Sequence, residues 1–312
     1  MADIQEKYSA DLFRLYISHA ADLGINMDWK EKEVQNVRNH INRFYKFMRE
    51  NIEDVKYLEL EYNQIGSDYA KVILSKIIRN FLEIDNALEN FNLRRYLQLC
   101  FYETFNLMQD ARKSLGSNKD FQVVFKLVYE DWLKILSLTM PHLCEELWEF
   151  SGHKDFISKT IWSEFNTTYI NSSLEFEFEY ISNLLEDITK VRKVIKATNI
   201  KEIFVYTAPK WKNEVAKIVK SKKGEFKSII SELKAESNLI KNKKVMPFIK
   251  TLINNRSWDT KISVENESEI LERFKSYLEA KVKSKIIINS EFDPETKSDK
   301  AIPNKPALYI KS

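Results

Sequence analysis

The sequence predicts a mainly α-helical protein: an antiparallel helical bundle followed by a small α+β domain. Apolar residues recur every three or four positions through most of residues 1–165, the period of a helix buried on one face. Only five glycines occur in 312 residues, which points away from glycine-rich loops and toward helices. Short apolar runs such as Ile203–Tyr206 and Ile286–Ile288 predict strands in the last third of the chain.

Length and composition favour two domains. A chain of 312 residues is long for one compact unit, and 44% apolar residues are ample for buried cores. Residues 166–173 are polar and without periodicity, which is typical of a linker. We therefore expect a helical domain over residues 1–165, a linker over 166–180 and a basic α+β domain over 181–312.

The first domain should hold a series of helices joined by short links. Asp28 and Glu31 have the spacing of a capping box, so a helix should begin there. Asn92 is expected to cap a later helix in the same domain. In chain order, the helices are predicted within residues 3–23 (a short one and a longer one), from 28 to about 52, from 67 or 68 to 88, from 92 to 115, and from 121 to 138.

The segment Met140–Trp148 joins two helical patterns. Pro141 has no backbone N–H and disfavours helical geometry at Met140, so the preceding helix should stop or kink there. Proline is well placed in the first turn of a new helix, and Glu145 and Glu146 should complement the positive end of that helix. On spacing alone, the corner can be read as a junction whose residues only pack.

After residue 180 the pattern changes to short helices and strands. Helices are predicted over residues 181–196, from Pro209, and over 225–233 and 247–253, and strands over 203–206, 286–288 and 307–310. The charge changes as well: residues 181–312 hold 28 Lys+Arg and 17 Asp+Glu, whereas residues 1–180 hold 21 and 29. The second part is therefore basic enough to bind a polyanion such as nucleic acid, with solvated surface lysines as the alternative.

Three segments resemble the class I aminoacyl-tRNA synthetases for leucine, isoleucine and valine. Met140–Trp148 (MPHLCEELW) resembles the corner PH-x-x-EELW of their helical anticodon-binding domain. Glu6–Tyr16 (EKYSADLFRLY) is similar to the segment that directly follows their Lys-Met-Ser-Lys-Ser catalytic loop, with Ser9 in place of the usual glycine. Pro303–Ile310 (PNKPALYI) is similar to the ending of archaeal-type leucyl-tRNA synthetases, whereas the isoleucyl and valyl relatives finish differently.

The resemblance implies that the chain binds leucine tRNA. The helical domain would support the tRNA body, and the carboxy-terminal domain would reach the elbow and the long variable arm. The class I signatures His-Ile-Gly-His and Lys-Met-Ser-Lys-Ser are absent from these residues, so this chain alone is predicted not to activate leucine. A catalytic part not present in this chain, such as a separate catalytic synthetase subunit, would perform the leucylation. A non-catalytic helical protein-interaction scaffold and a regulatory tRNA-binding relative are the alternatives.

Cations are the candidate contacts to RNA. Lys210-Trp211-Lys212 places an aromatic ring between two cations, which could stack on a base and neutralise phosphate. The tRNA-binding candidates of the second domain are Lys190, Arg192, Lys193, Lys196, Lys210, Trp211, Lys212, Lys241, Lys243, Lys244 and Lys305. The bundle adds Arg38, Arg43, Arg94 and Arg95. For each lysine the alternative is a solvated surface position, and for Trp211 it is a place in the core.

No catalytic residue, metal site or cofactor is predicted in this chain. His142 has no nucleophile or metal partner nearby in the sequence, so a capping or packing role is expected. His19, His40 and His153 lack ligand spacing. ATP and magnesium would act only through the missing catalytic part.

The predicted setting is the cytoplasm. Cys100 and Cys144 have no metal-ligand neighbours and are expected to be reduced thiols in the core. No signal peptide is visible, and no apolar run approaches the roughly 20 residues of a membrane span. The expected partner is tRNA(Leu), with no membrane and no DNA.

Overall fold

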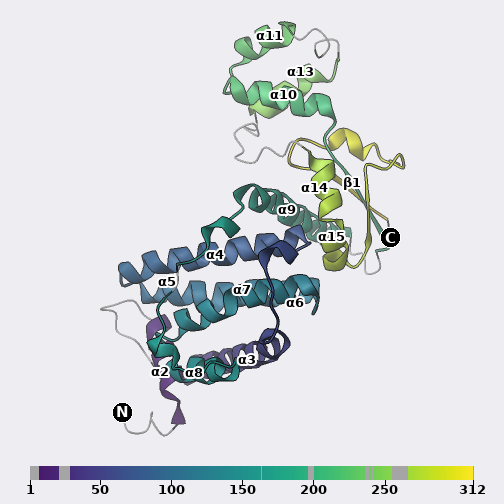
Figure 1. The fold of residues 1–312 in the computed structure, drawn as a ribbon. Coiled ribbons are helices and arrows are strands. Elements are labelled where there is room, and N and C mark those ends of the chain that lie inside the picture. The colour runs from purple at the N-terminus through teal and green to yellow at the C-terminus, as the bar shows by residue number, and fades with distance from the viewer. Residues whose placement is uncertain are drawn as a thin grey trace. The chain divides into compact units, whose positions relative to one another are not determined.

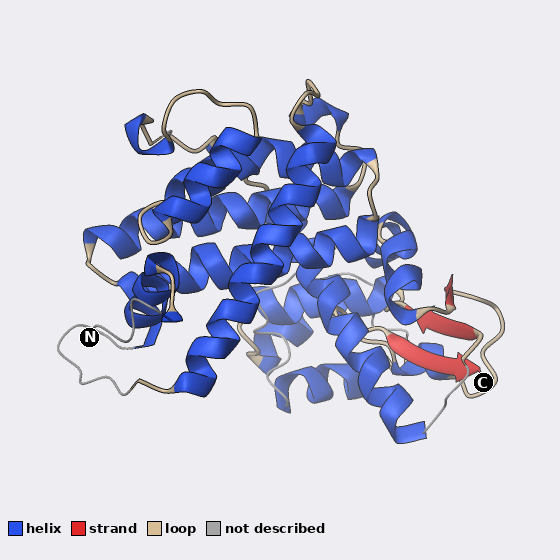
Figure 2. Ribbon diagram, turned by 90° about the horizontal axis from the view of Figure 1, so that it is seen from below, coloured by secondary structure: helices blue, strands red, loops and turns tan. Residues whose placement is uncertain are grey.

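The computed structural model describes residues 7–20, 29–162, 164–195, 200–235, 239, 242–254 and 266–311. The chain divides into two compact units, Met1–Glu175 and Phe176–Ser312 (Figure 1). Among the described residues, helices prevail and the strands are confined to the carboxy-terminal unit (Figure 2). A helical bundle followed by a small α+β region confirms the predicted fold class.

The first unit is a bundle of helices. Its elements are α2 (Ala10–Ala20), α3 (Glu31–Val55), the 3-10 turn η1 (Tyr62–Gln64), α4 (Asp68–Glu89), α5 (Leu93–Leu97), the π-helical turn η2 (Gln98–Glu103), α6 (Thr104–Leu115), α7 (Lys119–Leu136), α8 (Pro141–Phe150), and the 3-10 turns η3 (Ile157–Lys159) and η4 (Thr167–Tyr169). Helix α9 (Ser172–Ile195) begins in this unit and continues into the next.

The core of the first unit is built around Trp132 of α7. Its ring lies 5.2 Å from the ring of Phe44 of α3 and 6.4 Å from that of Phe105 of α6, and all three side chains are fully buried. The indole N–H donates to the carbonyl oxygen of Cys100 at 2.7 Å, so the polar atom of this buried side chain is satisfied. One residue thereby ties three segments of the bundle together.

Several helix ends are where the sequence predicts them. Asn92 caps α5, because its side chain accepts from the backbone N–H of Arg95 at 2.9 Å. Gly116 follows α6 with a φ of 68°, a conformation that glycine adopts without strain. Pro141 occupies the first position of α8, which confirms the predicted corner.

The helix predicted to begin at Asp28 begins three residues later. Helix α3 begins at Glu31 with Lys30 as its N-cap residue, and Asp28 lies outside the described residues. The carboxylate of Glu31 accepts from the indole N–H of Trp29 and from the hydroxyl of Tyr8. Glu31 is therefore bound both by a neighbour and by Tyr8, a residue 23 positions away.

The segment predicted as a linker also differs from the expectation. It holds η4 and the start of α9, which begins nine residues earlier than predicted. Asn171 acts as the cap, since its side chain accepts from the backbone N–H of Leu174 at 3.0 Å. Leu174, Phe178 and Ile181 are buried at helical spacing, which overrides the alternation of Glu and Phe in this segment.

The second unit combines short helices with a three-stranded sheet. Its elements are β1 (Glu202–Tyr206), α10 (Lys210–Ser221), α11 (Phe226–Ala235), α13 (Val245–Asn254), α14 (Glu267–Arg273), α15 (Lys275–Val282), β2 (Lys285–Ile288), the 3-10 turn η5 (Lys297–Lys300) and β3 (Ala307–Lys311). The strand order is β2-β1-β3, with β1 parallel to β2 and antiparallel to β3. A parallel pair needs a long crossover, which the segment between β1 and β2 supplies.

The strands agree with the predicted ones to within a residue, whereas α14 and α15 were not predicted. Both helices are short, at seven and eight residues, and only a few of their residues are buried. Such segments carry too little apolar periodicity to be recognised in a sequence.

Candidate nucleic-acid interface

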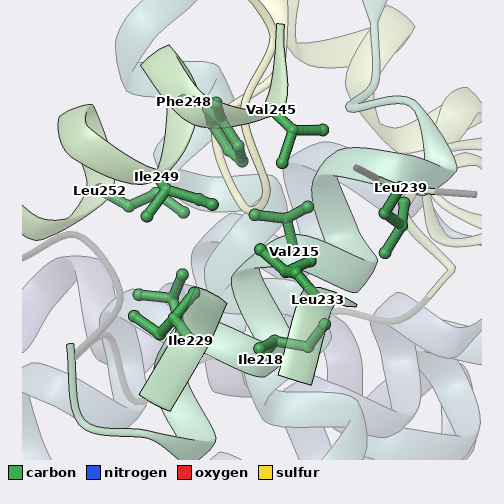
Figure 3. Close-up of a cluster of buried hydrophobic side chains, with 10 residues drawn as sticks. Val215, Ile218, Ile229, Leu233, Leu239, Val245, Phe248, Ile249 and Leu252 are labelled. Carbon is green, nitrogen blue, oxygen red and sulfur yellow. The ribbon is translucent and has the colours of Figure 1, made fainter. Parts of the chain in front are cut away.

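Helices α10, α11 and α13, together with their connections (residues 210–254), form a strongly basic region that we call the basic helical group. It contains twelve lysines and four glutamates. Apolar side chains of the three helices, such as Val215, Ile229 and Phe248, point toward one another and fill the space between them (Figure 3). Because the interior is apolar, most of the lysines lie on the surface, where they can meet a polyanion.

Three of the predicted RNA contacts lie on this surface. Lys210, at the start of α10, and Lys243 and Lys244, just before α13, are all exposed. Lys244 pairs with Asp299 at 2.9 Å, an exposed ion pair that contributes little to stability and that an RNA phosphate could replace. Lys241 lies outside the described residues.

Trp211 is partly buried and packs inward. Its ring meets that of Phe248 edge-on, with centroids 5.5 Å apart, and the side chain packs against the apolar interior of the group. The side chain therefore lies close to the core position that was the alternative for it in the sequence, although it is not fully buried. The reason is its place in α10, one helical turn before the buried Val215.

Lys212 was predicted to contact RNA, and the structure contradicts this. Its side chain is buried, at 6% exposure, and its Nζ donates to the carbonyl oxygens of Asp299 and Ala301 at 2.7 and 2.6 Å. Burial lowers the pKa of this ammonium group, while the charge of Asp299 opposes the shift. Lys212 therefore fastens the carboxy-terminal segment to α10.

The turn Ala301–Lys305 brings a further cation to the basic helical group. Ile302 packs against the apolar interior of the group and forms a bridge with Lys305, whose side chain is exposed. Asn304 adopts a positive φ of 63°, and its N–H donates to Glu267 at 2.8 Å. Lys305 thus lies on the turn whose first residue, Ala301, is hydrogen-bonded to Lys212.

Glu267 is a residue that sequence reasoning missed. It is 3% exposed, and burial raises the pKa of its carboxyl group. The carboxylate accepts from the N–H groups of Asn304 and Ala208, which fixes the two loops that follow and precede the basic helical group. A glutamate in the first turn of a short helix looks like an ordinary complement to the helix dipole, so no signal in the sequence reveals this role.

The cations of α9 serve different purposes. Arg192 donates to the carbonyl oxygen of Val282 at 2.9 Å, at the carboxyl end of α15, and is half-buried there. Lys190 pairs with Glu186 and Asp187 within its own helix. Lys193 is exposed, and Lys196 lies outside the described residues. Arg192 is therefore less available to RNA than its sequence indicates.

Contacts within the bundle hold Arg38 and Arg95, two of its four predicted arginines. Arg38 donates to the backbone of Lys7 at 2.8 Å, and Arg95 forms ion pairs with Glu83 and Glu103. Arg43 and Arg94 are exposed.

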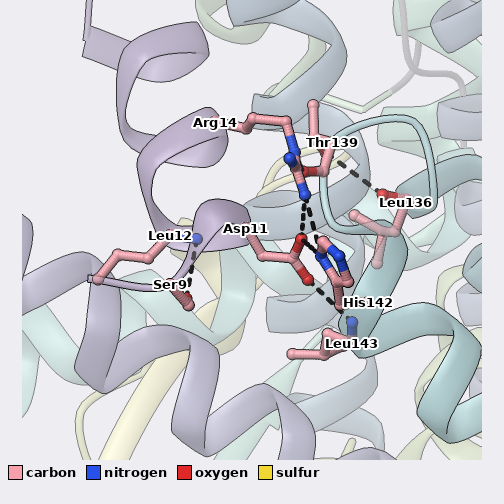
Figure 4. A network of polar contacts seen from close by, with 8 residues as sticks. All are labelled: Ser9, Asp11, Leu12, Arg14, Leu136, Thr139, His142 and Leu143. Atoms are coloured by element: carbon pink, nitrogen blue, oxygen red, sulfur yellow. Dashed lines mark hydrogen bonds and ion pairs between the residues drawn. The ribbon is translucent and has the colours of Figure 1, made fainter. Parts of the chain in front are cut away.

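The corner at Pro141 is held by a carboxylate from another helix (Figure 4). Asp11 of α2 accepts from the N–H of Leu143 at 2.8 Å and lies 2.9 Å from Nδ1 of His142. Arg14 pairs with the same carboxylate and donates to the carbonyl oxygen of Thr139 at 3.1 Å. Since Met140 offers no side-chain oxygen, Asp11 supplies the cap that α8 lacks.

The predicted complement to the dipole of α8 is therefore wrong in its residues. Glu145 accepts from the backbone of Ile157 and Ser158, and Glu146 binds the hydroxyl of Tyr45. Both glutamates are engaged with other segments of the bundle.

Cys100 and Cys144 are buried free thiols, and burial raises the pKa of both, which removes the thiolate a nucleophile needs. Within the described ranges, no group of three or more His, Cys, Asp or Glu could hold a metal ion. Among the described helices, none is long and apolar enough to cross a membrane.

The chain is similar to tRNA ligases along nearly its whole length. Residues 70–207 match the anticodon-binding domain of tRNA ligase. The chain is 34% identical over 311 residues to the leucine–tRNA ligase of Pyrococcus horikoshii, a match that covers 99% of this chain and 31% of that protein. It is 31% identical over 306 residues to the leucine–tRNA ligase of Archaeoglobus fulgidus, which covers 98% of this chain and 31% of the relative.

The chain spans about a third of the length of these curated relatives. A solved structure, the LeuRS–tRNA–LeuAMS ternary complex from Agrobacterium radiobacter K84, has a TM-score of 0.46 and 16% sequence identity, over 55% of this chain and 21% of that chain. The sequence matches confirm the resemblance to archaeal-type leucyl-tRNA synthetases that three short segments predicted.

Proposed function

We propose that this chain, a homologue of part of the archaeal leucine–tRNA ligases that includes an anticodon-binding domain, binds leucine tRNA so that a catalytic part formed by other residues can leucylate it. The bundle would support the tRNA body. The second unit would bind the elbow and the long variable arm through its basic surface. The catalytic part could be a separate chain, and this chain would hold neither ATP nor a metal ion itself.

The observation that carries the proposal is the basic helical group. Its sequence holds twelve lysines against four glutamates, and most of these lysines lie outside the apolar interior, so its surface carries an excess of positive charge. Electrostatic attraction to phosphates is the main source of affinity in sequence-independent RNA contacts, and it needs such a surface rather than particular bases. The leucine specificity of the proposal comes from the named relatives.

A cytoplasmic setting belongs to the proposal. Its support is the pair of free cysteines, because thiols that stay unpaired are usual in reducing compartments.

The test is a binding titration of the whole chain with a leucine tRNA transcript between about 50 and 300 mM salt. We expect log affinity to fall linearly with log salt, with a slope of about 0.7 to 0.9 per neutralised phosphate. The triple variant Lys210→Gln, Lys243→Gln and Lys250→Gln removes three exposed cations of the basic helical group. Its slope should be smaller than the wild-type slope by about two to three.

A matched control removes the same charge from the bundle. Lys32, Lys113 and Lys154 are exposed lysines of the first unit, and changing all three to Gln should alter the slope much less. Equal losses in both triple variants would mean that the basic helical group has no special part in binding. A wild-type chain that ignores tRNA at 50 mM salt would refute the function and favour a protein-interaction scaffold.

A further inference from the structure

The exposed ion pair between Lys244 and Asp299 joins the basic helical group to a segment outside it. Nζ of Lys244 lies 2.9 Å from both carboxylate oxygens of Asp299, which follows 55 positions later in the chain. Both side chains are mostly exposed, at 62% and 61%. An exposed ion pair is usually weak, because holding two mobile side chains together costs conformational entropy. The strength of this pair therefore depends on how firmly the backbone holds each partner.

Hydrogen bonds on both sides fix the backbone of Asp299. Its carbonyl oxygen accepts from Nζ of the buried Lys212 at 2.7 Å, and its N–H donates to the carbonyl oxygen of Thr296 at 3.2 Å. The carboxylate of Asp293 closes the preceding turn, because it accepts from the first two backbone N–H groups of η5 at 2.6 and 2.9 Å. Asp299 is therefore carried by a turn that is ordered before any ligand binds.

The backbone of Lys244 is fixed as well. Its N–H donates to the side-chain oxygen of Asn242 at 2.9 Å, and its carbonyl oxygen accepts from the N–H of Phe248 at 3.3 Å. The next residue, Val245, is 1% exposed and points into the apolar interior of the basic helical group (Figure 3). Since both backbones are ordered in advance, part of the entropy that weakens an exposed ion pair is not lost here.

The charges of Lys212, Lys244 and Asp299 act on one another. Burial has the largest effect on the pKa of the Lys212 ammonium group and lowers it, whereas the carboxylate of Asp299 raises it and the charge of Lys244 lowers it. Asp299 turns its carbonyl oxygen toward the buried lysine and its carboxylate toward the exposed one. Of the two lysines, Lys244 is the one that a phosphate group from solution can reach.

We propose that Asp299 is an internal competitor of RNA: its carboxylate occupies, on Lys244, the place that a phosphate group of the RNA backbone takes in the complex. The proposal rests on the proposed function and adds to it a residue that lowers the affinity. A carboxylate and a backbone phosphate present the same feature to an ammonium group, namely two oxygens that share a negative charge and accept charge-assisted hydrogen bonds. RNA must displace Asp299 before it can bind Lys244.

Such a competitor limits the binding of unsuitable polyanions. Contacts to phosphate carry no information about the bases, so each available lysine of the basic helical group adds affinity for any RNA. The pair with Asp299 withholds the charge of Lys244 until a phosphate group is held close enough to replace the carboxylate. The pair is therefore closed in the free protein and open in the complex.

The test removes the charge of Asp299 and keeps its backbone. Asp299→Asn retains the carbonyl oxygen that accepts from Lys212, so the midpoint of urea unfolding should stay close to that of the wild type. In titrations of the whole chain with the leucine tRNA transcript, the salt slope of the variant should be larger by about 0.7 to 0.9, because Lys244 then neutralises a phosphate without displacing a carboxylate. The affinity should rise about two- to fivefold, since RNA no longer has to break an exposed ion pair.

A second substitution tests that the gain passes through Lys244. In the double variant Asp299→Asn with Lys244→Gln, both charges of the pair are gone, so the affinity and the salt slope should return to about the wild-type values. Asp299→Glu keeps the negative charge and should retain most of the competition. A double variant that binds as tightly as Asp299→Asn would overturn the role of Lys244 in the proposal.

The matched control removes the same charge from the same loop. Glu295 is an exposed carboxylate that pairs with Lys297 at 3.0 Å, outside the basic helical group. Glu295→Gln changes the net charge of the chain as Asp299→Asn does, and it should change the salt slope and the affinity much less. Equal gains in the two variants would show that net charge, rather than competition at Lys244, governs the affinity.

The outcomes separate the two proposals. If tRNA binds the wild type, but Asp299→Asn changes neither the affinity nor the slope, Asp299 is not a competitor and the proposed function stands. If the wild type ignores tRNA at about 50 mM salt and Asp299→Asn binds it, the competition is confirmed and the proposed function fails for the wild-type chain. If neither chain binds, both proposals fail.

Discussion

The ammonium group of Lys212 donates to the carbonyl oxygen of Ala301 at 2.6 Å, from inside the second unit. A second hydrogen bond, to the carbonyl oxygen of Asp299, completes a clasp between α10 and the carboxy-terminal segment. A lysine that reads in the sequence as a contact to RNA is therefore a structural residue. The charge of a lysine does not distinguish the two roles. They differ in the partner of the ammonium group, which here is a pair of backbone carbonyl oxygens.

Changing Lys212 to Met should destabilise the protein without changing the salt dependence of RNA binding. The variant keeps much of the side-chain volume but leaves two carbonyl oxygens without a donor, so we expect the free energy of unfolding to fall by about 1–3 kcal/mol. Urea unfolding of the whole chain measures this. The control is Lys210→Met, which removes an exposed charge from the same helix and should have the opposite profile: unchanged stability and a smaller salt slope. Equal stabilities for the two variants would contradict the clasp.

Asp11 should stabilise the corner at Pro141, although the two residues are more than a hundred positions apart in the sequence. Asp11→Ala removes the acceptor for the N–H of Leu143 and the partner of His142 and Arg14, so we expect a loss of about 1–3 kcal/mol in the free energy of unfolding. Asp11→Asn keeps an acceptor oxygen and should lose less. Thermal or urea unfolding compares the two. If Asp11→Asn is as damaging as Asp11→Ala, the charge of Asp11 rather than its capping contact is what matters.

The π-helical turn should depend on the hydroxyl group of Thr104. Thr104→Val preserves shape but leaves the carbonyl oxygen of Leu99 without its donor in a fully buried place, and we expect a loss of about 1–3 kcal/mol in the free energy of unfolding. Thr104→Ser keeps the hydroxyl group and loses only a methyl group, which costs about 1 kcal/mol. Urea unfolding measures both. A Val variant as stable as the wild type would show that the turn does not need this hydrogen bond.

The first unit should lose stability as the pH falls below 6.5. The folded pKa values of His19 and His40 lie below the ordinary value of 6.5, mainly because of burial. The unfolded chain therefore binds more protons in this window, so the stabilisation present above pH 6.5 is lost as the pH falls through the folded pKa values.

The double variant His19→Gln with His40→Gln should flatten this dependence. Urea unfolding at pH 7.5, 6.5 and 5.5, without phosphate in the buffer, compares it with the wild type. A wild-type stability that stays constant over this range would contradict the prediction. So would a double variant with the same pH dependence as the wild type, because His19 and His40 would then not be its source.

The sequence predicted local features well where a single residue decides them. Asn92 caps its helix, Gly116 ends one, and Pro141 begins one, because each acts through its own backbone or through a neighbour within three positions. The three strands were found for a similar reason, since short β-branched and aromatic runs need little context. The family resemblance also came from short strings, which longer alignments with archaeal leucine–tRNA ligases confirm.

The predictions failed where a distant partner decides the outcome. Glu31 was expected to close a capping box and binds Tyr8 instead, and Glu145 was expected to complement its own helix and caps the turn at Ile157. In each case the sequence correctly indicated a carboxylate near a helix start. It could not show that the fold brings other hydrogen-bond donors, the hydroxyl of Tyr8 and the backbone N–H of Ile157, to these carboxylates.

By itself, then, the sequence determined that this is a helical bundle followed by a basic α+β unit, and that lysines accumulate in the second half. Only the tertiary structure decided which of those charges remain on the surface. It turned Lys212 and Arg192 toward backbone carbonyls and placed Arg43 against the imidazole of His40. The physical reason is that periodicity, composition and capping act along the chain, whereas the partner that satisfies or exposes a charge is fixed by packing between residues far apart in it.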